Sequence, residues 1–369
     1  MGHDNGDGAE ARTLWAESEQ PVALNQIGQP EALSELPGEA ARAPYSPGER
    51  AASGARQVVS AADVGEETML RPTVQPPARG WRRAVFRLSA GTVRVGPAAG
   101  ELRQRELVAR VKTPIRGCRK VAFISRKGGV GKTSTCLLAG HTFAVYRGDR
   151  VVAFDGNPDA GTLGHRVKRE TSATVTSLLA DAERVERYAD IRAYTSQAPS
   201  RLEVIAADDN PQLTHGLAEK EFARAVALLE RHYNLVCLDT GTGVLDSATR
   251  GILDASDQVV VVSATSLDGA RAASLTLDWL EENGHRDLAE GAVAVLNAVR
   301  PARGLVDLDR VEQHFASRCR ACVRIPWDPH LEAGAEAVVE ELRPATRQAY
   351  LELAAAIAAA FTESSRRRS

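Results

Sequence analysis

Short apolar runs alternate with segments of helical periodicity along the last two-thirds of the chain. The runs occupy residues 121–125, 151–154, 203–206, 235–238, 259–262, 292–296 and 322–325. Between them, apolar residues recur at helical spacing, for example in Phe222–His232, Ala270–Glu282 and Tyr350–Phe361. Continuously apolar strands that alternate with helices indicate a parallel sheet covered on both faces. We therefore predict an α/β fold with a mostly parallel sheet of about seven to eight strands and helices on both faces.

The first part of the chain lacks this pattern. Residues 1–78 are rich in Ala, Gly, Glu, Pro and Ser, and acidic residues outnumber arginines. Such a composition buries too little apolar surface to offset the ordering entropy, so we predict a disordered acidic extension. Residues 79–118 are basic and carry two apolar stripes at helical spacing, Trp81, Val85 and Leu88, then Leu107, Val108 and Val111. We interpret them as a basic linker with short amphipathic elements, which pack on the next domain or bind an anionic membrane, nucleic acid or a partner.

Composition adds few constraints to this picture. The 369 residues are 43% hydrophobic and 25% charged, with a formal net charge of −2, which is ordinary for a globular protein. A domain over 119–362 and a basic tail over 363–369 complete the expected organisation. The N-terminus lacks a signal-peptide pattern, no apolar run is long enough to span a membrane, and five scattered cysteines suggest reduced thiols. We expect a cytoplasmic protein, with peripheral attachment to the inner face of the membrane as an alternative.

A glycine-rich loop follows the first apolar run and opens a helical pattern. The loop contains Gly128, Gly129, Val130 and Gly131, and Lys132, Thr133 and Ser134 begin the helix. Glycines let backbone N–H groups turn inward, and the helix directs its positive dipole end at an anion. We expect Gly128–Ser134 to bind phosphates, with Lys132 on the outer phosphates and the Thr133 hydroxyl on Mg²⁺.

The loop departs from the standard P-loop in a specific way. Arg126 stands where the first glycine would fall, and a second lysine, Lys127, precedes the glycines. This resembles the deviant loop of the MinD/ParA ATPases, whose signature is KGG-x-GK-[ST]. The resemblance implies a P-loop NTPase that uses ATP and Mg²⁺. It also implies a homodimer that closes on ATP, in which Lys127 reaches the partner's phosphates and hydrolysis then separates the subunits.

Two later strands end in carboxylates that the same resemblance places at the magnesium site. The run 151–154 ends at Asp155, and the run 235–238 ends at Asp239, a Walker B pattern. The stretch after Asp155 is similar to switch I, where the family often carries an Asp that orients the attacking water. Here that residue is Asn157, which can orient water but cannot accept its proton. We expect slow hydrolysis, or a contribution from Asp159.

Polar residues after the last two strands resemble the family's adenine site. Asn297, Pro326 and Asp328 match positions that contact adenine in the family. Nearby, Cys319 and Cys322 form a C-x-x-C pair. We interpret this pair as a helix end and a core strand, with a cluster shared by two subunits as the alternative.

The resemblance extends over about residues 119–362 and narrows to one subgroup. The stretches Asp155–Leu163 and Arg192–Ser196, with the lead-in Trp81–Arg83, look like actinobacterial MinD-like ATPases associated with type VII (ESX) secretion. This implies an ATP-operated switch that positions or regulates a secretion or cell-envelope assembly through a protein partner. A DNA-partitioning ATPase of the ParA type and an iron–sulfur scaffold that uses Cys319 and Cys322 remain alternatives. A related tyrosine kinase is disfavoured because the tail has no tyrosine.

Overall fold

The computed structural model describes most of the predicted domain. The described residues are 98–158, 161–208, 219–241, 247–301 and 306–362, together with Leu88. All belong to a compact unit that begins at Pro72. The predicted extension 1–78, most of the lead-in before Ala98 and the basic tail 363–369 lie outside the described residues.

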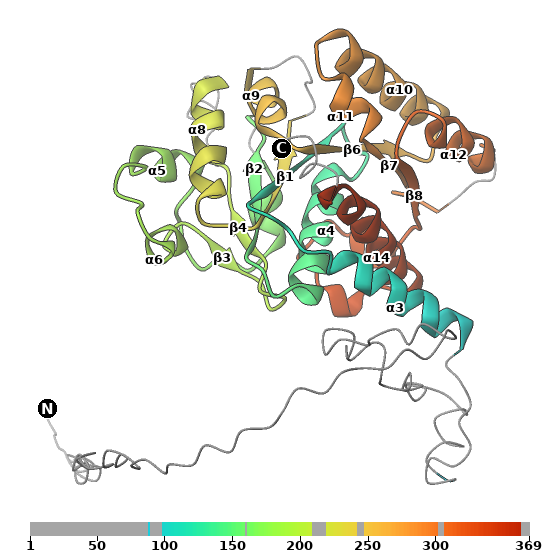
Figure 1. Cartoon of the computed structure of the whole chain (residues 1–369), viewed down its shortest axis with the longest axis horizontal. Helices are drawn as coiled ribbons and strands as arrows, with labels where there is room; N and C mark the ends of the chain where they lie inside the picture. The colour runs from blue at the N-terminus through green and yellow to red at the C-terminus, as the bar shows by residue number, and fades with distance from the viewer. Residues whose placement is uncertain are drawn as a thin grey trace, which may run out of the picture. The chain divides into compact units, whose positions relative to one another are not determined.

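An eight-stranded sheet forms the centre of this unit (Figure 1). The strand order is β3-β4-β2-β5-β1-β6-β7-β8, and every neighbouring pair is parallel except β3 and β4. The strands are β1 (Arg119–Ile124), β2 (Val151–Gly156), β3 (Ser196–Gln197), β4 (Glu203–Ile205), β5 (Leu235–Thr240), β6 (Gln258–Ala264), β7 (Val293–Asn297) and β8 (Ala321–Ile325). Each of the seven apolar runs forms a strand, which confirms the predicted fold class. The two-residue β3 was not predicted.

Helices cover the two faces of the sheet and create two separate cores. Successive residues of β1 face opposite ways: Val121 and Phe123 belong to one core, and Ala122 and Ile124 belong to the other. The first core is covered by α3 (Ala99–Val111), α4 (Lys132–Tyr146) and α14 (Pro344–Ala358). The second is covered by α5 (Val175–Ala180), α6 (Tyr188–Arg192), α8 (Glu219–Glu230), α9 (Ser247–Ala255), α10 (Leu267–Glu282), α11 (Arg286–Glu290) and α12 (Leu308–Ala316).

Short elements join these layers. They are the helix α13 (Pro329–Glu332) and the single-turn 3₁₀ segments η2 (Leu163–Arg166), η3 (Val339–Glu341) and η4 (Ala359–Phe361). The turn η2 contacts β2, β4 and α4. No helix among the described residues is long and apolar enough to cross a membrane.

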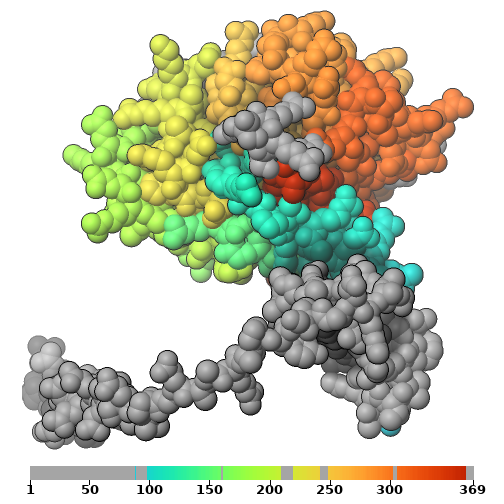
Figure 2. Space-filling model, in the orientation of Figure 1, coloured from blue at the N-terminus to red at the C-terminus, as the bar shows by residue number. Residues whose placement is uncertain are grey.

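The helix α3 comes from the predicted basic linker and packs on the domain. Its second apolar stripe faces inward, because Leu107 and Val111 are buried and Val108 packs against the first core. The Arg147 guanidinium holds the end of α3 by donating to the carbonyls of Val111 and Thr113 at 2.5 and 2.7 Å. In Figure 2, α3 (cyan) lies beside atoms of the last helices (red). The final helix is likewise a core element, with Tyr350, Leu353 and Ile357 among its buried residues.

Candidate nucleotide site

The glycine-rich loop connects β1 to α4, in the predicted strand–loop–helix order. Gly129 and Gly131 have φ angles of 73° and 82°, in the left-handed region that other residues rarely adopt. Gly131 is also crowded, because a Cβ there would lie 2.2 Å from the Asn297 amide nitrogen. The loop therefore requires glycine at both positions, which leaves backbone N–H groups available at the start of α4.

Hydrogen bonds fix the two ends of the loop. At its start, the Lys127 amide donates to the Ser125 hydroxyl at 3.2 Å. At its end, the Thr135 hydroxyl donates to the Gly131 carbonyl at 2.8 Å. Asn297, at the end of β7, donates its side-chain amide to the Val130 carbonyl at 2.9 Å. A loop held at these points keeps its conformation and has less to order on binding.

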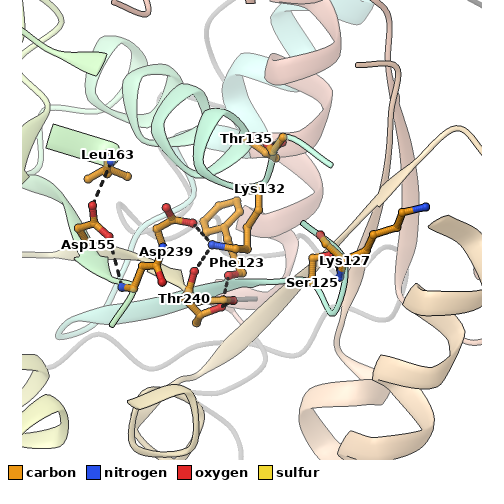
Figure 3. A network of polar contacts seen from close by, with 12 residues as sticks. Phe123, Ser125, Lys127, Lys132, Thr135, Asp155, Leu163, Asp239 and Thr240 are labelled. Carbon is orange, nitrogen blue, oxygen red and sulfur yellow. Dashed lines mark hydrogen bonds and ion pairs between the residues drawn. The ribbon is translucent and has the colours of Figure 1, made fainter. Parts of the chain in front are cut away.

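Lys132, the first residue of α4, turns back onto the end of β5. Its ammonium group forms a 2.6 Å ion pair with Asp239 and donates to the Thr240 carbonyl (Figure 3). Both side chains are almost fully covered, with 7% of Lys132 and 1% of Asp239 exposed. The Thr240 hydroxyl in turn donates to the Phe123 carbonyl at 3.0 Å, which ties β5 to β1 at this level. The lysine of the loop and the Walker B carboxylate are therefore brought together as the motif order predicts.

Asp155 lies beside Asp239 because β2 and β5 are parallel neighbours with these two residues in register. Its carboxylate accepts the amides of Leu163 at 3.0 Å and Asn157 at 3.3 Å. Burial, assisted by the nearby charge of Asp239, raises the pKa of Asp155 to about 7, although these two hydrogen bonds and Lys132 act to lower it. Gly161 is needed here as well, since a Cβ would lie 1.9 Å from the Asp155 carboxylate.

The ion pair of the cluster leaves Asp155 without a cation of its own. Lys132 pairs with Asp239, the Arg166 guanidinium also lies near Asp239, and burial penalises the ionised form of Asp155, which is an excess of negative charge at that residue. A small divalent cation would offset this excess, and oxygen ligands suit Mg²⁺. Thr133 follows Lys132 in the first turn of α4 and carries a hydroxyl group. Asp155 and Asp239 therefore supply oxygen donors of the kind that Mg²⁺ prefers, and the Thr133 hydroxyl as a further ligand stays a prediction.

The signature lysine Lys127 behaves differently from Lys132. In Figure 3 its side chain extends away from the Lys132–Asp239 pair. The residue is partly exposed, and no ion pair joins it to the part of the chain that the structure describes. Its ammonium group is therefore placed to act outward from the loop rather than on the same phosphates as Lys132.

The residues after β2 and β5 are only partly described. Asn157 follows β2 directly, and its backbone bonds to Asp155 while the residue stays partly exposed. Asp159 lies outside the described residues, as do residues 242–246, which include most of the glycine stretch after Asp239. The choice between Asn157 and Asp159 in hydrolysis stays a prediction.

The predicted adenine residues occupy neighbouring strand ends. Asn297 pairs in register with Ile325, so it lies next to Pro326 at the edge of the sheet. The Asp328 carboxylate is buried and accepts the backbone amides of His330 at 3.1 Å and Arg343 at 2.9 Å. These bonds hold α13 and the start of α14, and the hydrogen bonds to Asp328 lower its pKa although burial opposes them. Asp328 therefore has a structural role, and its contact with adenine stays a prediction.

The sequence missed several residues that build this site. Leu163 and Gly161 position Asp155, and the carbonyl of Thr240 receives Lys132. Burial lowers the pKa of Arg166, on η2, and the negative charge of the nearby Asp239 opposes this effect. The Arg166 Nε has no hydrogen-bond partner among the described residues. Gly161 could have been found from its residue type and its place shortly after Asp155. Leu163 acts through its backbone amide, so its side-chain type gives no indication of this role.

The cysteine pair lies away from this cluster. Cys319 follows α12 and Cys322 is in β8, as a helix end and a strand. Burial raises the pKa of the two thiols to about 11 and about 12, which opposes the thiolate form that an iron–sulfur cluster needs. Within the described ranges, no group of three or more His, Cys, Asp or Glu residues is arranged for a metal ion.

Comparisons with known proteins show what the chain resembles. A family model described as an AAA domain matches residues 118–289. The ESX-1 secretion-associated protein EspI of Mycobacterium tuberculosis is 38% identical over 291 residues. This match covers 78% of the chain but 43% of EspI, so the chain spans less than half the length of that relative. The sporulation initiation inhibitor protein Soj of Bacillus subtilis is 26% identical over 258 residues, covering 65% of the chain and 98% of Soj.

Solved structures share the fold. A ParA family ATPase from Chlorobium tepidum aligns with a TM-score of 0.55 at 18% identity, over 64% of this chain and 98% of its own. The cell division ATPase MinD of Pyrococcus furiosus aligns with a TM-score of 0.52 at 19% identity, over 65% and 98%. At these identities the structures establish the fold, while the loop Lys127–Thr133 carries the family signature. The predicted resemblance is confirmed: the chain is similar in sequence to the secretion-associated EspI and to Soj, and it has the fold of the MinD and ParA ATPases.

Proposed function

We propose that the chain binds Mg-ATP at the carboxyl ends of β1, β2 and β5, hydrolyses it slowly and uses ATP-dependent dimerisation as a switch. The observation that carries this proposal is the buried cluster of Lys132, Asp239 and Asp155 directly below the glycine-rich loop. Such a charge arrangement costs stability unless it serves a ligand. Here the ligand would be the phosphate chain and its cation.

Each residue of the cluster has a distinct task in this proposal. The loop amides and the start of α4 bind the phosphates, and Lys132 moves from Asp239 to the outer phosphates. Asp155, Asp239 and the Thr133 hydroxyl would hold Mg²⁺, which supplies positive charge against the charge that develops on the transferred phosphoryl group. Before ATP binds, the ion pair with Asp239 keeps the Lys132 side chain oriented within the site.

Hydrolysis requires a water molecule aimed at the outer phosphate. Asn157 is next to Asp155 at the exit of β2, so its amide is the residue we assign to orienting that water. An amide holds water by hydrogen bonds but takes no proton from it, which accounts for slow turnover. Slow turnover suits a switch, because the ATP-bound state then persists long enough to act.

Dimerisation is assigned to Lys127. Two Mg-ATP sites that face each other repel one another unless cations cross between them. Lys127 leaves the loop on the side away from Lys132, so it is available to the phosphates of a second copy. Lys127 is therefore needed for the dimer to close but not for one subunit to bind ATP.

The cellular role follows from the similarity to EspI, whose printed name places that protein with ESX-1 secretion. We propose a cytoplasmic switch, in peripheral contact with the inner face of the membrane, that regulates a secretion or cell-envelope assembly through a protein partner. The basic tail, residues 363–369, is the segment assigned to such contacts. Affinity purification with ATP and a slowly hydrolysing Asn157→Ala variant would test this role; recovery of chromosomal DNA alone would contradict it.

Light scattering with ATP, ADP and a non-hydrolysable analogue tests the switch. Wild type should dimerise with ATP, whereas Lys127→Ala should bind ATP, stay monomeric and lose nearly all ATPase activity. Lys220→Ala removes an exposed lysine from α8 and is the matched control. A Lys127→Ala protein that dimerises with ATP as wild type does would contradict the switch while leaving the nucleotide site intact.

A further inference from the structure

An apolar pocket of about 390 Å³ opens between the far end of the phosphate-loop helix α4 and the start of α14. It lies away from the nucleotide cluster, at the opposite end of α4. Apolar and aromatic side chains dominate its walls, and the main contributors are Leu138, Val145, Tyr146, Val339, Leu342 and Tyr350. Val145 is 47% exposed at its rim, an uncommon exposure for a valine in a core-facing helix. Such a pocket is suited to a small number of apolar side chains.

The helix α3 brings the preceding chain to this pocket. It runs parallel to α14: Arg103 pairs with Glu352 at 3.1 Å, while the C-terminal end of α3 meets Arg147, whose guanidinium lies over the Phe361 ring. Five helical residues, or about 7.5 Å, separate Arg103 from Ala98, and the same length separates Glu352 from Arg347. The start of α3 is therefore level with Arg347, which lines the pocket.

The loop beside the pocket is acidic. Glu332, Glu336, Glu340 and Glu341 are all exposed between α13 and α14. Glu341 pairs with His330 and Glu332 accepts the Trp327 ring N–H, whereas Glu340 directly lines the pocket. An apolar pocket with an acidic margin favours a basic amphipathic segment over an acidic or uncharged one.

The chain carries such a segment a short distance before α3. Residues 81–88 read Trp-Arg-Arg-Ala-Val-Phe-Arg-Leu, with Trp81, Val85 and Leu88 at helical spacing and three arginines between them. Leu88 is 88% exposed, so its apolar side chain has no cover. The ten residues from Leu88 to Ala98 can span up to about 33 Å, enough to place the segment on the pocket.

We propose that residues 81–88 bind in this pocket of the same chain. The Trp81, Val85 and Leu88 side chains enter between α4 and α14, and the arginines face the glutamates of the 332–341 loop. Because the segment is joined to α3, the contact is intramolecular and benefits from a high effective concentration. It would attach the N-terminal part of the chain to the helix that begins with Lys132, independently of ATP hydrolysis.

Hydrogen–deuterium exchange of the full-length protein tests this contact. Backbone amides of residues 82–88 should exchange at least about tenfold more slowly in wild type than in Val145→Glu, because the charge blocks the pocket. Leu275→Glu is the matched control: Leu275 is 53% exposed on α10, far along the chain from the pocket. It should leave the protection unchanged. Thermal unfolding checks that both variants remain folded.

A charge exchange provides a second readout. Arg82→Glu with Arg83→Glu should abolish the protection, and adding Glu336→Arg with Glu340→Arg should restore it. Free-peptide exchange rates at residues 82–88 in wild type, or equal protection in Val145→Glu, would overturn the proposal. Protection that disappears on roughly hundredfold dilution would assign a second copy instead. Protection that arises only with vesicles of anionic phospholipid would assign the membrane, and either result would also overturn it.

Discussion

Two buried acidic clusters lie near opposite ends of neighbouring strands and differ in how their charges are matched. At the β3–β4 edge, Glu203 accepts the hydroxyls of Tyr188, Tyr233 and Thr195 and lies 3.6 Å from the Arg192 guanidinium. One carboxylate is thus matched by several donors. At the end of β2 and β5, two carboxylates share one lysine.

The difference separates structure from function. Around Glu203, burial raises the pKa of Tyr188 to about 12, assisted by its bond to Glu203, so the phenol stays a donor at every physiological pH. The network is closed and requires nothing further. Beside Asp239, burial raises the pKa of Asp155 to about 7, so this carboxyl group is only partly ionised near neutral pH. Its surroundings do not supply enough positive charge to stabilise the ionised form. Charge left unmatched in this way is typical of a ligand site, which is the basis of the proposed function.

Breaking the closed cluster should have the largest effect on stability. Glu203→Ala leaves two phenols, a hydroxyl and Arg192 without their shared acceptor. We expect a loss of about 3–5 kcal/mol in the free energy of unfolding, measured by urea denaturation, with unchanged ATP affinity for the folded protein. Glu183→Ala, at a highly exposed ion pair, should cost little. A loss of ATP affinity in folded Glu203→Ala would remove the contrast between the clusters.

The incomplete cluster should instead show itself through pH. The pKa of folded Asp155 is raised from 3.8 to about 7, so the folded state binds a proton more tightly than the unfolded state. The stability from this proton is complete below about pH 4 and is lost as pH rises to 7, on the order of 2–4 kcal/mol. Asp155→Asn should lack this slope.

Mg²⁺ sharpens the same measurement. At pH 8, where Asp155 is ionised, added Mg²⁺ should raise the unfolding temperature of wild type more than that of Asp155→Asn. The dependence of the unfolding temperature on pH can be compared for the two proteins between pH 4 and 8. Identical dependence would show that the folded state does not raise the pKa of Asp155.

The smallest expected effect lies at the adenine side. Asn297→Ala removes the bond to the Val130 carbonyl and should weaken ATP binding by about 1 kcal/mol, measured by calorimetry. Wild type should prefer ATP to GTP, because a site built for one base leaves polar groups unpaired with the other. Equal competition by GTP and ATP would place the base elsewhere.

The sequence predicted one cluster and missed the other for a physical reason. Strand-end residues such as Asp155 and Asp239 follow apolar runs, and parallel strands bring their ends to one edge, so the nucleotide site is predictable. Glu203 meets Tyr188 and Tyr233 through side chains from separate elements, and no spacing rule joins them. The two residues of β3 escaped for a similar reason: Ser196 pairs because Val204 is opposite, and the pair carries no apolar signal.

Calorimetric titration of Mg-ATP into Lys132→Ala tests the central claim most directly. Loss of this cation should weaken ATP binding by roughly 2–4 kcal/mol relative to wild type, while Lys112→Ala should bind normally. Thr133→Val keeps the Lys132–Asp239 pair and should lose mainly the Mg²⁺-dependent part of the affinity, so a folding defect cannot imitate both results. Unchanged ATP affinity in folded Lys132→Ala would contradict the assignment of this cluster as the nucleotide site.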